Sequence, residues 1–283
     1  MRHLKGILQC ERFQVPYRVC GEGQDVLCLN GAQQSMAMWL SFLQRFRDKY
    51  RITLFDFPHQ GKGKVLEGST SVSLDEEVEI LRALVSELGI KRPIICSASW
   101  GGVVALQFAA RFPQHVSRLI LASIAMKPNG RMKETIMTGM QAKLDDREHM
   151  AQVLLKSFGG DLPGVCKNQI IAQFKSMPPD RIQAFAEHGM SVIFSGSLDK
   201  VVALSDVRNP TLILYGDKDR ILDLSDVESL VAALPECRLR TVKGIGHFLH
   251  LENESVFDIY EEVLEKARSE IADMTHEPFN VTY

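Results

Sequence analysis

The stretch PIICSASWGGVVAL, residues 93–106, decides the fold of this chain. It begins with an apolar run short enough for one buried strand, which ends at a cluster of small residues. A segment with helical periodicity follows at once. The pattern therefore predicts a strand, a sharp turn and a helix, with Ser99 at the tip of the turn.

Small side chains flank Ser99 on both sides. A serine hydroxyl that stands clear of a sheet needs a strained backbone, and bulky neighbours would collide with the turn. Gly101 meets this demand, and Ser97 is a small residue where such turns usually have glycine. The pattern favours a nucleophilic serine, although an ordinary connection between a parallel strand and a helix would show a similar pattern.

The length, charge and composition of the chain limit the classes of protein to which it can belong. A chain of 283 residues can bury the core of one large α/β domain and still hold an insertion. The formal net charge of −2 gives no overall attraction to nucleic acid or to an anionic membrane. The sequence has no apolar run of membrane-spanning length, no hydrophobic signal segment after Met1, and six cysteines without metal-like spacing. We therefore expect a cytoplasmic protein with reduced cysteines, no nucleic-acid partner and no stable membrane insertion.

A second functional turn is predicted where the buried run 25–29 ends at Asn-Gly, residues 30–31, before a helix predicted at about 36–46. A glycine turn after a buried strand can aim a backbone N–H at a nucleophile, so the N–H of Ala32 is the first candidate oxyanion donor. The N–H of Trp100, at the positive end of the helix after Ser99, is the second. Without a reactive serine, the Asn-Gly pair would be a plain turn.

Two other segments are predicted to be structural. The glycine-rich loop 57–64 lacks the spacing with which a Gly-rich loop wraps a phosphate. Ser73 followed by Glu76 predicts a capping box at the start of a helix that ends near Leu88 and has one apolar face. This helix leads into the strand before Ser99.

The strand pattern disappears between residues 127 and 200, where amphipathic helical segments replace it. We therefore expect a first core part at 1–126, a helical cap at 127–200 and a second core part at 201–283. Seven of the eleven methionines lie between Met126 and Met190. Flexible thioether side chains can shape a cavity around an acyl chain, or they can simply fill the core of the cap.

An acidic loop follows the strand predicted at 211–215. Asp219, three residues after Gly216, would lie at the carboxyl edge of the sheet, where it could orient a catalytic histidine. Asp217 and Asp223 are rivals for this role, because acidic loops after strands are common. We choose Asp219.

The candidate base is His247, in a glycine-flanked loop between a strand at 239–242 and a final helix at about 254–271. From such a loop the imidazole can reach over the sheet edge to Ser99. His250 is the rival, and its position at the start of the helix favours a structural role. We expect the last dozen residues to form a loose tail.

Ser99, Asp219 and His247 follow one another in the order serine, acid, histidine, which is the chain order of α/β-hydrolases. Five motifs then carry a closer resemblance: residues 97–102, 30–32, 54–58, 75–81, and 246–249 with 251–252. They resemble the α/β-hydrolase subfamily that holds the 3-(3-hydroxyalkanoyloxy)alkanoate synthase of rhamnolipid assembly and the 3-hydroxyacyl-ACP:CoA transacylase or thioesterase of polyester synthesis.

This resemblance implies an α/β-hydrolase fold, with a mostly parallel central sheet flanked by helices and an inserted helical cap. It also implies 3-hydroxyacyl thioesters as substrates, with acyl carrier protein (ACP) or CoA as the carrier. The likeness fades between residues 127 and 200, the segment that would select the substrate. Near Gly216 it is limited to the Gly-x-x-Asp spacing.

The residues predict a serine-dependent acyl-transfer enzyme, either a hydrolase or an acyltransferase. His247, oriented by Asp219, would take the proton of Ser99 as the serine attacks an ester or thioester, while the N–H groups of Ala32 and Trp100 stabilise the oxyanion. Since side chains and backbone complete this chemistry, we expect no metal and no organic cofactor.

Two other functions remain open, a general carboxylesterase or thioesterase and a non-catalytic hydrolase-fold binding protein. The basic run of Lys127, Arg131 and Lys133 opens the predicted cap. It could steer an acidic ACP towards the site, or it could be an ordinary solvated face.

Overall fold

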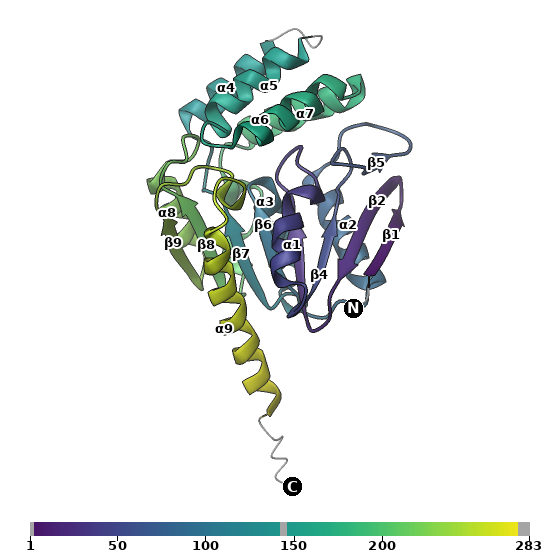
Figure 1. Cartoon of the computed structure of the whole chain (residues 1–283), viewed down its shortest axis with the longest axis vertical. Coiled ribbons are helices and arrows are strands. Elements are labelled where there is room, and N and C mark those ends of the chain that lie inside the picture. Colours follow the sequence, from purple (N-terminus) through teal and green to yellow (C-terminus); the bar gives the residue numbers. More distant parts are fainter. Residues whose placement is uncertain (1–2, 142–145, 277–283) are drawn as a thin grey trace.

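One central sheet organises the computed structural model, which describes residues 3–141 and 146–276 (Figure 1). Within these residues the sheet has nine strands: β1 (His3–Cys10), β2 (Phe13–Cys20), β3 (Gln24–Leu29), β4 (Tyr50–Phe55), β5 (Lys64–Val65), β6 (Ile94–Ala98), β7 (Arg118–Ala122), β8 (Thr211–Gly216) and β9 (Cys237–Val242). The spatial order is β1-β2-β4-β3-β6-β7-β8-β9, and β5 pairs with β2.

The sheet is parallel except at one end. β2 runs antiparallel to β1 and β4, whereas every neighbouring pair from β4 to β9 along the sheet is parallel. Strands covered on both faces are mostly apolar, and all five residues of β6 are buried, including the polar Ser97. The parallel strands end at one edge of the sheet, so the loops that carry the candidate residues gather there. The mostly parallel sheet predicted from the sequence is confirmed.

Helices cover both faces of the sheet (Figure 1). A 3₁₀ turn (Met36–Trp39), α1 (Leu40–Phe46) and α9 (Val256–His276) supply one buried cluster. The other cluster is formed with α2 (Leu74–Glu87), α3 (Trp100–Arg111) and α8 (Leu224–Ala233). The predicted capping box is present at the start of α2, where Ser73 and Glu76 satisfy each other's backbone N–H groups.

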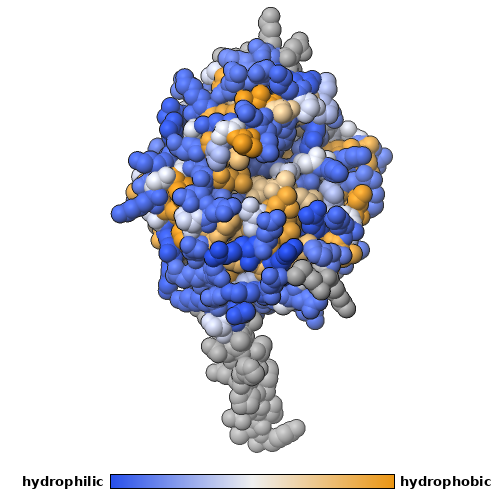
Figure 2. All heavy atoms as spheres, in the orientation of Figure 1, coloured by the Kyte–Doolittle hydropathy of each residue, from blue (hydrophilic) through white to orange (hydrophobic). Residues whose placement is uncertain are grey.

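In the described residues, four α-helices lie between β7 and β8, inside the segment for which the sequence predicts a cap. They are α4 (Gly130–Gln141), α5 (Arg147–Phe158), α6 (Gly164–Ser176) and α7 (Pro179–Ser195). Figure 1 shows them as a layer above the carboxyl edge of the sheet. Part of this layer has its own buried cluster, which includes Met150, Phe174 and Ile182. Apolar residues also reach its surface, as the orange spheres near the top of Figure 2 show.

The chain departs from the predicted elements at two places. The helix predicted at 36–46 begins with a 3₁₀ turn. The last helix continues to His276, so the tail predicted for the last dozen residues is wrong as far as that residue, and 277–283 lie outside the described residues. Once nucleated, a helix continues readily, because each added residue gains a hydrogen bond. No helix in the described part of the chain is long and apolar enough to cross a membrane.

Candidate active site

Ser99 occupies a strained turn between β6 and α3. Its φ of 48° and ψ of −117° lie in a region that residues with a side chain rarely adopt. Two hydrogen bonds hold the turn: the Ser99 N–H donates to the carbonyl of Ala122 at 2.8 Å, and the Gly102 N–H donates to that of Ser99 at 2.8 Å. The serine side chain therefore stands at the carboxyl edge of the sheet, and the residue is only half-buried.

The small residues around Ser99 have to be small, because larger side chains at their positions would clash with neighbouring atoms. A Cβ on Gly101 would lie 2.6 Å from the carbonyl oxygen of Asn30, and one on Gly102 would lie 2.8 Å from Ile124. Ser97 is fully buried, and among the described residues its hydroxyl has no hydrogen-bond partner. A serine thus fits at the position where glycine is usual, with an unpaired buried hydroxyl as the consequence.

Of the three acidic candidates, Asp219 contacts His247. Its Oδ2 lies 2.7 Å from the His247 Nδ1, both side chains are buried, and its Oδ1 accepts the N–H of Ile221 at 3.0 Å. Asp217 instead accepts the N–H of Gly244 at 2.6 Å. Asp223 lies outside this group, since it accepts an amide N–H of Asn129 at 3.0 Å. The structure therefore brings together the two residues that the sequence pairs as acid and base.

The loop around His247 is held on both sides. The Glu252 carboxylate accepts the N–H of Gly246 at 2.6 Å and that of Phe248 at 3.0 Å. The Ser123 hydroxyl donates to the His247 carbonyl at 2.5 Å. These contacts fix the backbone from which the imidazole projects, and neither Glu252 nor Ser123 was identified from the sequence as part of the site.

His250 has a structural environment. Its ring stacks on Trp39 with centroids 4.8 Å apart, and its Nε2 lies 3.1 Å from the Met38 carbonyl oxygen. Burial lowers the pKa of His250 to about 4, so the ring is neutral near pH 7. It belongs to the aromatic cluster beneath α9.

The turn that carries Ala32 is anchored by side-chain amides. Asn30 donates to the carbonyl of Phe55 at 2.8 Å and to the Gln60 side chain at 2.9 Å, and Gln60 in turn donates to the Gly31 carbonyl at 3.1 Å. Among the described residues, no protein acceptor takes the Ala32 N–H. The loop 57–64, predicted to be structural, thus supplies a brace for this turn.

Two side chains of the predicted cap reach the same region. Arg181 of α7 donates to the carbonyls of His59, at 3.0 Å from its Nε, and of Gly61, at 3.2 Å. Gln173 of α6 donates to the Gln33 carbonyl at 2.9 Å. Sequence reasoning missed these contacts, because a side chain that binds a distant carbonyl leaves no local pattern.

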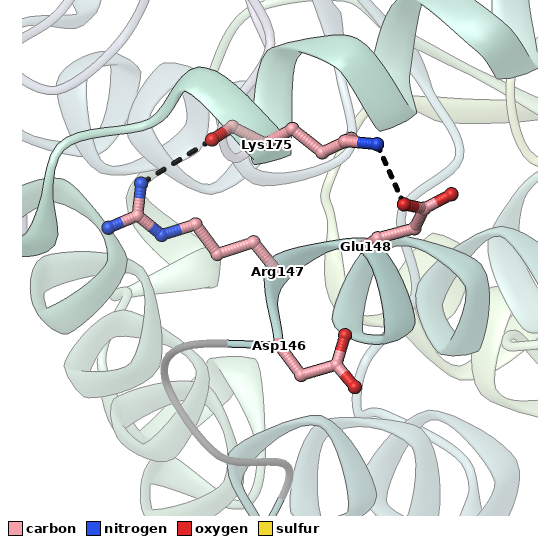
Figure 3. Close-up of a pocket in the computed structure, with 4 residues that line it drawn as sticks. All are labelled: Asp146, Arg147, Glu148 and Lys175. Carbon is pink, nitrogen blue, oxygen red and sulfur yellow. Dashed lines mark hydrogen bonds and ion pairs between the residues drawn. The ribbon is translucent and has the colours of Figure 1, made fainter.

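A shallow hollow on the predicted cap is lined by charged residues (Figure 3). Its charged groups already have partners: Lys175 pairs with Glu148 at 2.8 Å, and Arg147 donates to the carbonyl of Lys175 at 3.5 Å. Asp146 caps the start of α5 by accepting the His149 N–H at 3.1 Å. These residues hold α5 against α6. In the described residues we find no group of three or more His, Cys, Asp or Glu that could hold a metal ion.

Comparisons with known proteins agree with this architecture. The chain is 24% identical over 265 residues to a 2-hydroxy-6-oxo-6-phenylhexa-2,4-dienoate hydrolase of Comamonas testosteroni, covering 87% of this chain and 89% of that protein. Its structure is similar to that of a thermophilic esterase from Thermogutta terrifontis, with 20% identity, a TM-score of 0.77 and coverage of 95% and 100%. A carboxylesterase from Bacillus subtilis gives 17% identity, a TM-score of 0.74 and coverage of 93% and 91%.

At these identities, the likeness to the solved structures establishes the fold. The family model described as "alpha/beta hydrolase fold" matches residues 26–254, which is most of the chain. The chain therefore belongs to the α/β-hydrolase fold family, and it is an enzyme of that family.

Proposed function

We propose that this enzyme transfers acyl groups from esters or thioesters through a covalent intermediate on Ser99. The observation that carries the proposal is the buried pair of His247 and Asp219, with its 2.7 Å contact, at the sheet edge where the strained turn presents a serine. A carboxylate on Nδ1 holds the imidazole in the tautomer whose Nε2 can accept a proton.

The proposed reaction has two halves. The Ser99 oxygen bonds to the acyl carbon while its proton passes to His247, and the carbonyl electrons move to an oxyanion held by the N–H groups of Ala32 and Trp100. Collapse breaks the bond to the alcohol or thiol, which leaves with the proton from His247. Water or a hydroxyl acceptor then repeats the sequence on the acyl-enzyme and releases the product.

For the substrate we propose a 3-hydroxyacyl thioester, held under a cap formed by residues 127–200. The support is the set of sequence motifs shared with enzymes of that substrate class, together with apolar side chains on the cap helices. A general carboxylesterase or thioesterase is the second candidate, and it is favoured by the similarity to the Thermogutta and Bacillus esterases. The strained turn at Ser99 argues against a non-catalytic binding protein, because that strain serves no purpose there.

Hydrolysis assays test this function. Purified enzyme should release p-nitrophenol from medium-chain acyl esters and discharge 3-hydroxyacyl thioesters. Ser99→Ala should fold normally and lose both activities by about 10³-fold or more, because only binding and oxyanion stabilisation remain. Ester hydrolysis without thioester discharge would leave the general carboxylesterase as the function.

The same assay separates the carriers. Arg131 is exposed and Lys133 is partly exposed, whereas Lys127 lies 3.4 Å from Asp226. If ACP docks on this basic run, reversing the charges of Arg131 and Lys133 should slow discharge of acyl-ACP, as should added salt, with little effect on acyl-CoA. Equal rates on both carriers, unchanged by charge reversal, would remove ACP from the proposal.

A further inference from the structure

The side chain of Trp100 is held from both sides. Its indole N–H donates to the Glu77 Oε2 at 2.7 Å, which ties the residue after Ser99 to α2 in the core. The His188 ring of α7 meets the indole edge to face, with centroids 4.3 Å apart and planes at 86°. The indole therefore connects the core, the serine turn and the cap.

Glu77 is an unusual residue for its position. Its neighbours on the inner face of α2, Val78 and Leu81, are fully buried, and Glu77 itself is only 7% exposed. A carboxyl group buried among apolar side chains is costly unless it is hydrogen-bonded, and an apolar side chain would fit this helix face without that cost. In the described part of the chain, the hydrogen bond that the Glu77 carboxyl accepts is the one from the indole N–H of Trp100.

We propose that Glu77 is a positioning residue for the oxyanion hole, because its hydrogen bond to the indole fixes the Trp100 residue whose backbone N–H faces the reacting carbonyl. This inference rests on the proposed acyl-transfer function. Trp100 is the first residue of α3, so its backbone N–H has no hydrogen-bond partner within the helix. The anchored indole limits how far this N–H can rotate away from the oxyanion.

The protonation state of Glu77 should make the reaction rate depend on pH if Glu77 has this positioning role. Burial raises the pKa of Glu77 to about 8, so the carboxyl is neutral at pH 7 and ionises as the pH rises further. A negative charge would then form beneath the site where negative charge develops in the reaction, and it would oppose oxyanion formation.

The surroundings of Glu77 leave little to offset that charge. On α2 the neighbouring Glu76 is paired with Arg12 at 2.8 Å, and on α3 Arg111 pairs with Asp75 and Glu79. Burial lowers the pKa of His188, on the far side of the indole, to about 4, so this ring is neutral when Glu77 ionises.

The experiment measures kcat and KM for p-nitrophenyl ester hydrolysis from about pH 6 to pH 9.5, with product quantified at a single pH after quenching. Wild-type kcat/KM should fall above about pH 8. Glu77→Gln keeps an acceptor for the indole N–H and cannot ionise, so it should retain most of the activity at pH 7 and lose this decline. Glu77→Leu removes the acceptor and should lower kcat about 10- to 100-fold at every pH, with a much smaller change in KM.

Two further variants complete the design. Trp100→Phe lacks the indole N–H and should lose as much kcat as Glu77→Leu, while the double variant should lose no more than either single one. Glu87→Gln, at an exposed position on the same helix, is the matched control and should behave as wild type.

A folded Glu77→Leu with wild-type kcat, or a Glu77→Gln that keeps the alkaline decline, would overturn the inference. If Ser99→Ala also stays active, the proposed function fails with it. If Ser99→Ala is inactive while the Glu77 variants behave as Glu87→Gln does, the inference alone fails.

Discussion

At the level of single residues, hydrogen bonds distinguish carboxylates that look alike in the sequence. Asp217 and Asp219 are two residues apart in one loop, yet Asp217 holds the N–H of Gly244 and Asp219 holds the ring of His247. Spacing from the end of β8 and the chain order of the three candidates were enough to choose Asp219. The contact itself depends on where the His247 loop lies, which no local pattern encodes.

Asparagine substitutions test this difference. Asp219→Asn should lower kcat by about 10³- to 10⁴-fold, because the amide favours the wrong tautomer of His247. Asp217→Asn keeps an oxygen acceptor for Gly244, so its kcat should stay within a few-fold of wild type. Steady-state kinetics on both variants decide the matter, and the reverse ranking would transfer the role to Asp217.

The buried position of Glu77 can be predicted from the sequence, but the role of its carboxyl group cannot. It lies four residues before Leu81 and seven before Leu84, so helical periodicity places a carboxylate on the buried face of α2. That signal was available from the sequence. Its partner, the indole of Trp100, was not, because α2 and α3 come into contact only once the sheet has folded.

At the level of elements, the segment between β9 and α9 acts as a frame for His247. Glu252 accepts the N–H groups on both sides of the histidine, so the carboxylate fixes two peptide units of the loop. A hydrogen bond to a charged group contributes about 1.5–3 kcal/mol to stability. The loop is therefore ordered by a residue that takes no part in the chemistry.

Removal of this carboxylate should affect stability and activity together. Glu252→Ala should lower the free energy of unfolding by about 2 kcal/mol or more, and it should reduce kcat because the imidazole is less well placed. Denaturant unfolding and steady-state kinetics measure both effects. Glu254→Ala, which removes an exposed carboxylate nearby, is the control; an equal effect in both variants would contradict this role for Glu252.

Element boundaries were predicted less well than element types. The capping box gave the start of α2 directly, because Ser73 and Glu76 are a local signal. The end of α9 was missed, since the helix predicted at about 254–271 continues to His276. Apolar periodicity indicates which face of a helix packs against the core, and it does not mark the residue at which the helix ends.

At the level of the whole molecule, several contacts among the described residues tie the helices of the predicted cap to the carboxyl edge of the sheet. Gln173 reaches Gln33 beside the first oxyanion candidate, Arg181 reaches the brace loop at His59, and His188 contacts Trp100. A movement of the cap would therefore disturb both proposed oxyanion donors. The layer over the sheet is part of the geometry of the site.

The sequence allowed the core to be predicted in more detail than the cap. Buried parallel strands and the loops at their carboxyl ends follow from short-range patterns, which is why Ser99, Asp219 and His247 could be proposed together. Amphipathic helices such as α4–α7 indicate only that one face is covered. Which helix covers which, and which cap side chains reach the core, depends on long-range packing.

Covalent trapping tests the central claim, that Ser99 is the acylated nucleophile. Enzyme treated with a fluorophosphonate, which reacts with activated serines, should gain one label per chain, on the peptide that contains Ser99. His247→Asn should label far more slowly, and Ser99→Ala should take up no label and show no turnover. Label on another residue of the active enzyme, or wild-type turnover by Ser99→Ala, would contradict the account.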